Sequence, residues 1–223
     1  MGIIDTFFNW NVLITTFPQL LRGLGTTCLL GLVSIALSLG GGLVLALARL
    51  YAHPRVQAVV RAYIDLFRAI PLLVLLVLIY YALPFVGIRL SPFAAAASAL
   101  SLVASAYTAE IFRSGIEAIP RGQFEACKAL GLNFWRTMRH VILPQAFRIV
   151  VPPITNNCVN VVKDTALASV VAMPDLLKQA TQAQALAANP TPLIGAAIIY
   201  IALLWPMVRA VRRLEQRFAA SGR

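Results

Sequence analysis

The sequence predicts an all-α integral membrane protein with five transmembrane helices and one long polar loop. Of its 223 residues, 60% are hydrophobic and only 12% are charged, and the mean hydropathy is +0.80. Ordinary soluble domains carry about 25% charged residues. Five windows are nearly free of charge and long enough to cross a hydrocarbon core about 30 Å thick, which takes about 20 helical residues. We therefore treat residues 1–223 as a single transmembrane domain.

The individual elements follow from the positions of aromatic residues, charges and prolines. The aromatic-rich start, residues 1–18, is expected to lie on the membrane surface, because aromatic side chains gather at the interface. Lys163 and Asp164 interrupt the fourth window. The fifth window begins late, because a polar stretch precedes it and Pro190 and Pro192 favour a helix start nearby. The predicted spans are about 20–48, 66–88, 90–112, 149–174 and 192–208.

The distribution of Lys and Arg selects the orientation of these spans. Five spans place the two ends of the chain on opposite sides of the membrane. If the N-terminus is outside, only Arg22, Arg89 and Lys178 remain outside, and most of the cations face the cytoplasm. Cytoplasmic segments of membrane proteins carry an excess of Lys and Arg. We therefore expect the C-terminus and the loop 113–148 to lie in the cytoplasm.

The loop 113–148 carries its own helix signals. Pro120 stops the third span, and apolar residues then recur at helical spacing over residues 123–130, with Gly131 where a C-terminal cap belongs. Asn133 can cap a second short helix, and Pro144 begins the next segment. A plain connecting loop is the alternative, but loops this long and this punctuated are uncommon. A short helix with one apolar face has little to bury by itself, so we expect it to dock into a groove on a soluble partner.

Charges inside the membrane are the second candidate site. Lys163 lies about 15 to 22 Å along the predicted fourth span, where a charge costs roughly 2.5 to 3.5 kcal/mol. Lys163 and Asp164 either form a polar site on a substrate path or pair with other helices to fix packing. Arg68 and Glu110 lie nearer the helix ends, where snorkelling or interfacial pairing is the competing explanation. Further hydrogen-bonding groups on the fourth span are Asn156, Asn157 and Asn160.

Several other functions find no support in the sequence. The 19 cations are scattered between apolar blocks, so they form no continuous basic face for nucleic acid. The three cysteines show no Cys-x-x-Cys spacing, which disfavours a metal site. No phosphate-binding loop motif and no hydrolase or metalloprotease motif occurs. The chain is therefore expected to bind no cofactor, to catalyse no reaction and to take its energy from a partner.

Short motifs resemble one protein family. The pattern Glu125-Ala126-Cys127, three intervening residues, Gly131, nine further residues and then Val-Ile-Leu-Pro ending at Pro144 resembles the "EAA" loop of permease subunits of ATP-binding-cassette (ABC) importers. The subfamily that takes up histidine, arginine, lysine, glutamine, glutamate or opines is similar at residues 67–73, 106–113, 120–123, 143–148 and 163–167. Two departures are Cys127 in place of the usual third alanine and Ala-Ile before Pro71, where Gly-Thr is common.

The resemblance implies a type I ABC importer permease fold in the bacterial cytoplasmic (inner) membrane. It implies a dimer of ATPase subunits that binds ATP and Mg, a second permease subunit that is identical or paralogous, and an external substrate-binding protein. The expected contacts to the ATPase are Gly122, Glu125, Ala126, Ala129, Leu130 and Gly131. The expected contacts to the polar amino acid are Lys163, Asp164, Arg68, Glu110 and Asn157.

Two alternatives from other classes remain at this point. In an ion-gradient-driven carrier or a channel, the loop 113–148 would be an intramolecular gate, and no ATPase would accompany the chain. A membrane anchor or scaffold would need no charges inside the membrane, so Lys163 and Asp164 argue against it.

Overall fold

A computed structural model of the chain describes residues 2 and 6–220, with the side chains of all of these except 219 and 220. All regular structure among these residues is helical. The longest helix, α2 (Trp10–Tyr51), begins after Asn9, whose side chain accepts a hydrogen bond from the Val12 N–H. Pro18 lies inside this helix. Residues 10–18 are thus the first turns of α2, with no break before the first predicted span, and the placement of segment 1–18 on the membrane surface stays a prediction. The rest of that segment lies partly outside the described residues.

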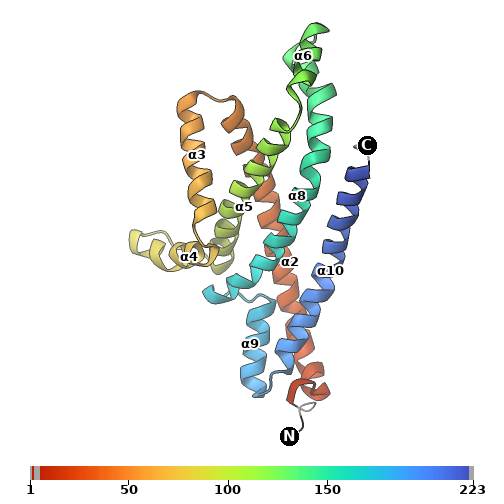
Figure 1. Ribbon diagram of the computed structural model, residues 1–223. Helices are drawn as coiled ribbons and strands as arrows, with labels where there is room; N and C mark the ends of the chain where they lie inside the picture. The colour runs from red at the N-terminus through yellow and green to blue at the C-terminus, as the bar shows by residue number, and fades with distance from the viewer. Residues whose placement is uncertain (1, 3–5, 221–223) are drawn as a thin grey trace.

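The second predicted span, 66–88, is broken rather than continuous. Helix α3 (Pro54–Ala69) ends at Ile70, and α4 (Leu72–Val77) continues through the π-helical η1 (Leu78–Ala82) and the 3-10 helix η2 (Leu83–Val86). The two parts meet at an angle of 102°. Ile70 has an extended backbone, because the ring of a following proline disfavours the helical conformation. Helix α4 therefore lies across the bundle while α3 runs along it (Figure 1).

The central helix is α5 (Pro92–Glu117), which contains the predicted span 90–112 almost entirely. Ser91 caps its first turn by accepting a hydrogen bond from the Ala94 N–H. The helix packs against α2, α3, α4 and α8 (Leu143–Asp164). Its alanine-rich sequence permits this close packing, and the largest apolar core lies where α4 and α5 meet α2.

The loop 113–148 and the fourth predicted span are arranged differently from the prediction. After α5 come α6 (Arg121–Ala129), α7 (Phe134–Thr137), the π-helical η3 (Met138–Ile142), α8, and the 3-10 helix η4 (Thr165–Val171). The helix that was expected to start near residue 149 is thus already continuous from Phe134. Lys163 is its next-to-last α-helical residue, about 30 Å from Leu143 instead of the expected 15 to 22 Å.

The last two helices are α9 (Leu176–Ala187), which the sequence analysis did not predict, and α10 (Thr191–Ala220), which contains the predicted span 192–208. Within the described residues, the helices α2, α5 and α10 are long and apolar enough to cross a membrane, and the bent pair of α3 and α4 is a fourth at most. Helix α8 is not among them, so the count of five spans is not confirmed.

Candidate functional site

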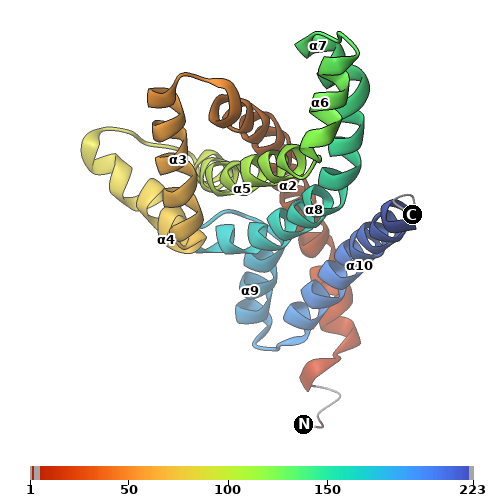
Figure 2. The same cartoon turned by 45° about the horizontal axis from the view of Figure 1, so that its top comes forward.

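The hairpin of α6 and α7 protrudes at one end of the molecule (Figures 1 and 2). Of the nine residues of α6, only Cys127 is buried, at 4% exposure. Phe124 is 36% exposed and Leu130 is 77% exposed, so most of the apolar face that the sequence predicts is uncovered in this chain. The residues predicted to contact an ATPase are all exposed: Gly122, Glu125, Ala126, Ala129, Leu130 and Gly131. They are accessible to a partner, and their contact with one stays a prediction.

Gly131 ends α6 in the manner that the sequence predicts. Its φ is +70°, in the left-handed region. The Gly131 N–H donates to the Lys128 carbonyl at 3.0 Å, and the Leu132 N–H donates to the Cys127 carbonyl at 3.0 Å. These two bonds form a Schellman motif, which satisfies carbonyls at the end of α6 and reverses the chain. Glycine suits this position because it has no Cβ to clash in the left-handed conformation.

The second half of the hairpin is tied to the body of the protein at its base. The Asn133 side chain caps α7 by accepting a hydrogen bond from the Arg136 N–H at 2.9 Å, as predicted. The Phe134 ring packs edge-on to Tyr51 at the end of α2, with 5.8 Å between the ring centres. Trp135 remains 77% exposed. The base of the hairpin is buried among Ile119, Met138, Ile142 and Ala146.

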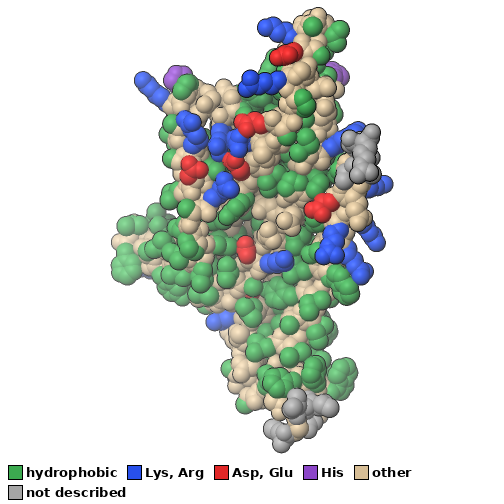
Figure 3. All heavy atoms as spheres, in the orientation of Figure 1, with side chains coloured by type: hydrophobic (Ala, Val, Ile, Leu, Met, Phe, Trp, Pro, Cys, Tyr) green, Lys and Arg blue, Asp and Glu red, His purple; other side chains and the backbone are tan. Residues whose placement is uncertain are grey.

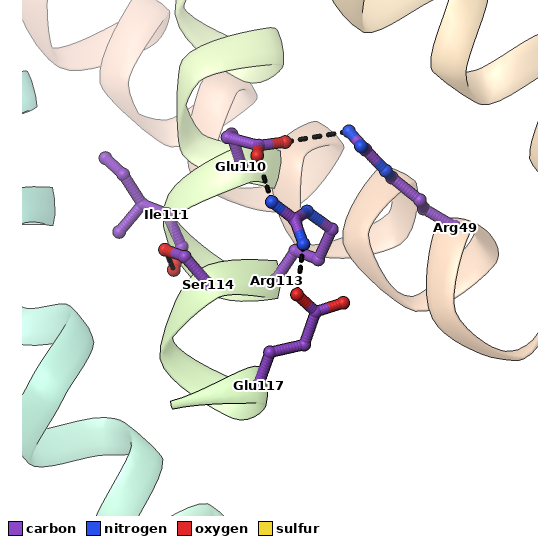
Figure 4. A network of polar contacts seen from close by, with 6 residues as sticks. All are labelled: Arg49, Glu110, Ile111, Arg113, Ser114 and Glu117. Atoms are coloured by element: carbon purple, nitrogen blue, oxygen red, sulfur yellow. Dashed lines mark hydrogen bonds and ion pairs between the residues drawn. The ribbon is translucent and has the colours of Figure 1, made fainter. Parts of the chain in front are cut away.

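An ion-pair network lies where α5 approaches this hairpin (Figure 4). The Arg49 guanidinium of α2 is 2.7 Å from the Glu110 carboxylate, and Arg113 pairs with both Glu110 and Glu117. Pairing of Glu110 was one of the two sequence interpretations, but Arg49 was missed, because no local pattern links residues 61 positions apart. Within this network the pair of Arg49 and Glu110 joins α2 to α5, about two helical turns before α5 ends at Glu117.

A second feature is a cavity of about 330 Å³ between α4, α5 and α8. Asn157, Asn160 and Asp164 form its polar wall, and Leu72 and Tyr107 are among its other lining residues. The three polar residues are spaced three and four apart, so they share one face of α8. This spacing was available in the sequence and would have grouped Asn160 with the two predicted residues. The cavity thus offers one carboxylate and two amides within a largely apolar bundle.

Thr108 on α5 holds the Asn157 amide in place. The Asn157 Nδ2 group donates a hydrogen bond to the Thr108 hydroxyl at 3.1 Å. Thr108 is fully buried, and it packs against Gly42 of α2 so closely that a Cβ on Gly42 would lie 2.5 Å from the Thr108 Cβ. With its NH₂ group engaged in this way, Asn157 has its carbonyl oxygen left to accept a hydrogen bond from a ligand.

The remaining predicted pathway residues lie outside the cavity lining. Lys163 is exposed, and Glu110 belongs to the ion-pair network. Arg68 is near the cavity, since its guanidinium lies 5.5 Å from the ring centre of Tyr107. The structure therefore brings Asn157 and Asp164 together in the cavity wall, places Arg68 against the lining residue Tyr107, and leaves Lys163 and Glu110 outside the lining. Among the described residues, no three His, Cys, Asp or Glu side chains are grouped so as to hold a metal ion.

Known proteins resemble this chain over most of its length. It is 39% identical over 176 residues to the probable amino-acid ABC transporter permease protein YckA of Bacillus subtilis. The aligned residues make up 79% of this chain and 78% of YckA. It is 34% identical over 218 residues to the probable glutamine ABC transporter permease protein GlnM of Bacillus subtilis, with 96% and 99% covered.

A solved structure and a family model agree with these relatives. The crystal structure of an amino acid ABC transporter with histidines superposes with a TM-score of 0.89 at 32% identity, covering 97% of this chain and all of that one. The family described as "binding-protein-dependent transport system inner membrane component" matches residues 38–220. This chain therefore belongs to the family of inner membrane components of binding-protein-dependent transport systems, the permease subunits of ABC transporters.

Proposed function

We propose that this chain is the translocation subunit of an importer for a polar amino acid, and that ATP hydrolysis on partner subunits drives the transport. The observation that carries the proposal is the polar wall of α8, where Asn157, Asn160 and Asp164 line one cavity. Ionisable residues within membrane helices are costly and mark substrate paths by default. Two of the similar proteins are described with glutamine and with histidines, which supports an amino acid as the cargo.

The cavity has the chemistry that the ammonium end of an amino acid requires. The Asp164 carboxylate supplies a negative charge, and the Asn157 carbonyl oxygen supplies a neutral acceptor. An ammonium group has three donors and no acceptor, so it pairs with such a surface. The cavity volume of about 330 Å³ suits a small ligand, at the lower end of the range of about 300 to 1,000 Å³.

The hairpin of α6 and α7 is the surface through which the ATPase acts in this proposal. A partner groove would cover Phe124 and Leu130, which the chain itself leaves exposed. Glu125 would supply a charged contact there, and Gly131 would hold the turn. ATP and Mg belong to the partner, because the sequence contains no phosphate-binding loop motif. A second permease subunit and an external binding protein complete the proposed importer.

The test is uptake by proteoliposomes that contain this chain with its ATPase, its second permease subunit and its binding protein. Glutamine, histidine, arginine and a non-polar control such as leucine are offered as labelled substrates. We expect uptake of a polar amino acid. This uptake should require hydrolysable ATP on the side of the membrane where the ATPase subunits lie, and it should stop when a non-hydrolysable analogue replaces ATP. Uptake that continues without ATP hydrolysis and follows an imposed ion gradient would overturn the proposal in favour of an ion-driven carrier.

A further inference from the structure

Helix α10 changes its chemical character at Trp205. From residue 191 to residue 208 it carries no charged side chain, and four arginines follow at Arg209, Arg212, Arg213 and Arg217. Tryptophan rings favour the boundary between hydrocarbon and headgroups, and Trp205 is 56% exposed. The edge of the hydrocarbon core therefore lies near Trp205, with the arginines beyond it.

A groove of about 510 Å³ runs along one face of α10 across this boundary. Its lining includes Trp205, Arg209, Arg213 and Arg217, which are spaced four residues apart and so share a face. Pro206 and Leu214 are among the apolar lining residues. The Arg209 guanidinium stacks over the Trp205 ring, 4.4 Å from its centre, which holds that side chain at the apolar end of the groove. The groove thus combines an apolar surface with a row of cations.

These cations have no acidic partner within the part of the chain that the structure describes. The ion pairs found there join Arg49 and Arg113 to acids of α5, and none involves α10. The nearby Glu215 is two positions from both Arg213 and Arg217, so it lies about 200° around the helix from each. In the space-filling view, Lys and Arg side chains gather along this part of α10, with an acidic side chain next to them (Figure 3).

We propose that this groove binds an anionic phospholipid, with the lipid phosphate between Arg209 and Arg213. The headgroup layer is about 5 to 8 Å thick on each side of the hydrocarbon core. Arg209 lies about 6 Å and Arg213 about 12 Å beyond Trp205 along the helix axis, and arginine side chains extend back toward the interface. A guanidinium binds phosphate oxygens through two parallel hydrogen bonds.

A lipid fits the groove better than a soluble anion or a protein does. The acyl chains would continue along the apolar part of α10, next to Trp205 and Pro206, whereas a free phosphate would leave that surface uncovered. Among the described residues, those that line the groove all belong to α10, and α10 lies at the edge of the helix assembly in both ribbon views (Figures 1 and 2). The groove therefore lies on the outer surface of the helix assembly, which membrane lipids surround.

Fluorescence quenching at Trp205 tests this proposal directly. The 223-residue chain carries three tryptophans, so Trp10→Phe and Trp135→Phe leave Trp205 as its only one. The chain is reconstituted in nanodiscs that contain brominated phosphatidylglycerol or brominated phosphatidylcholine at the same mole fraction. We expect stronger quenching by brominated phosphatidylglycerol. Arg209→Gln with Arg213→Gln should remove this preference, since each arginine near an anionic surface contributes on the order of fivefold in affinity.

The matched control is Arg55→Gln with Arg61→Gln, which removes the same charge from exposed positions of α3. It should keep the preference for phosphatidylglycerol. Equal quenching by the two lipids, or a preference that survives in the Arg209 and Arg213 variant, would overturn the proposal. The same measurement is repeated in the complex with the ATPase and the second permease subunit. If a protein occupies the groove, Trp205 is shielded from both lipids in the complex, and that result also overturns the proposal.

Discussion

At the scale of single residues, Gly131 carries a conformation that other residues resist. The cost of a left-handed backbone is roughly 1 to 2 kcal/mol for a residue with a Cβ. Gly131→Ala should therefore destabilise the hairpin by about that amount and lower ATP-driven uptake, while Gly131→Asn should recover much of both, because asparagine tolerates this region. Thermal unfolding of the purified protein and uptake by proteoliposomes measure the two effects.

Gly122 is the matched control for Gly131, because it is also exposed and also belongs to the hairpin. A Cβ at Gly122 would meet nothing within 4 Å, and its backbone is right-handed helical. Gly122→Ala should leave the thermal stability unchanged or raise it, since alanine favours a helix over glycine by roughly 0.5 to 1 kcal/mol. Equal stability losses in Gly131→Ala and Gly122→Ala would contradict the assignment of strain to residue 131.

Thr108 is expected to act on transport through Asn157. Thr108→Val keeps the shape of the buried side chain and removes the hydrogen bond to the Asn157 amide, which contributes about 0.5 to 1.5 kcal/mol. If the orientation of Asn157 matters for the substrate, the KM for uptake should rise about twofold to tenfold. Basal ATPase activity of the assembled complex should stay the same, which separates this effect from a loss of folding.

Thr155→Val provides the control for Thr108→Val. The Thr155 hydroxyl donates to the Val151 carbonyl of its own helix at 2.7 Å, and Thr155 is not among the cavity-lining residues. The KM for uptake should not change in this variant. An unchanged KM in Thr108→Val as well would show that the Thr108 contact only fixes packing.

Residue-level features could be predicted from the sequence where their cause is local. Gly131 and Asn133 cap helices through hydrogen bonds between residues three to five positions apart in the sequence, and short motifs predict such caps. Arg49 and Thr108 act on residues of other helices, Glu110 and Asn157. The pattern of residues within one helix does not indicate which face of another helix it will contact. These two pairs can therefore be identified only from the folded structure.

At the scale of helices, the crossing of α2 and α5 depends on Gly42. A Cβ on Gly42 would lie 2.5 Å from the Thr108 Cβ and 3.1 Å from the Ala109 backbone nitrogen, so the helices would have to separate. Gly42→Ala should lower the unfolding free energy by about 1 to 3 kcal/mol, as overpacking does. Gly40→Ala is the control, because its Cβ would meet nothing within 4 Å.

Both variants, Gly42→Ala and Gly40→Ala, are compared with the unchanged protein by their unfolding temperature in detergent and then by amino acid uptake in proteoliposomes. Gly42→Ala should also raise the KM, because any shift of Thr108 moves the amide of Asn157 that it holds. A Gly42→Ala variant as stable as Gly40→Ala would mean that the two helices do not approach as closely as the structure has them.

Two cases, the break between α3 and α4 and the helix α9, show why element boundaries were only partly predictable from the sequence. A hydropathy window adds apolar residues regardless of direction, so it joined α3 and α4 into one span although the chain bends by 102° between them. Pro71 after Ile70 was the available signal for that break. Helix α9 was missed because its glutamines suggest a loop, although Asp175 is an N-cap residue and accepts hydrogen bonds from the N–H groups of Leu177 and Lys178.

At the scale of the whole molecule, the start of α2 and the end of α10 lie toward opposite ends (Figure 1). This arrangement agrees with an odd number of membrane crossings. In the part of the chain that the structure describes, length and composition identify three helices that could cross a membrane, or four with the bent pair. Asn157, Asn160 and Asp164 are among the polar residues that lower the hydropathy of α8, so a search by composition overlooks a helix that turns a polar face toward a cavity.

The orientation of the molecule is the last prediction. Leu130 at the tip of the hairpin is 77% exposed, and Leu186 near the end of α9 is 85% exposed, and these elements lie at opposite ends (Figure 1). Lys and Arg side chains gather toward the hairpin end, while the opposite end is mostly hydrophobic on the face shown (Figure 3). The positive-inside rule then places Leu130 in the cytoplasm and Leu186 outside.

Single cysteines test this orientation in a background that lacks Cys28, Cys127 and Cys158, the native thiols of the described chain. A membrane-impermeant maleimide should label Leu186→Cys in spheroplasts and Leu130→Cys only in inverted vesicles. The reversed pattern would contradict the orientation, and labelling of both from one side would contradict the placement of the two elements at opposite membrane faces. Since an ATPase can reach only the cytoplasmic face, labelling of Leu130→Cys from outside would also remove the hairpin as the surface that receives the energy of ATP hydrolysis.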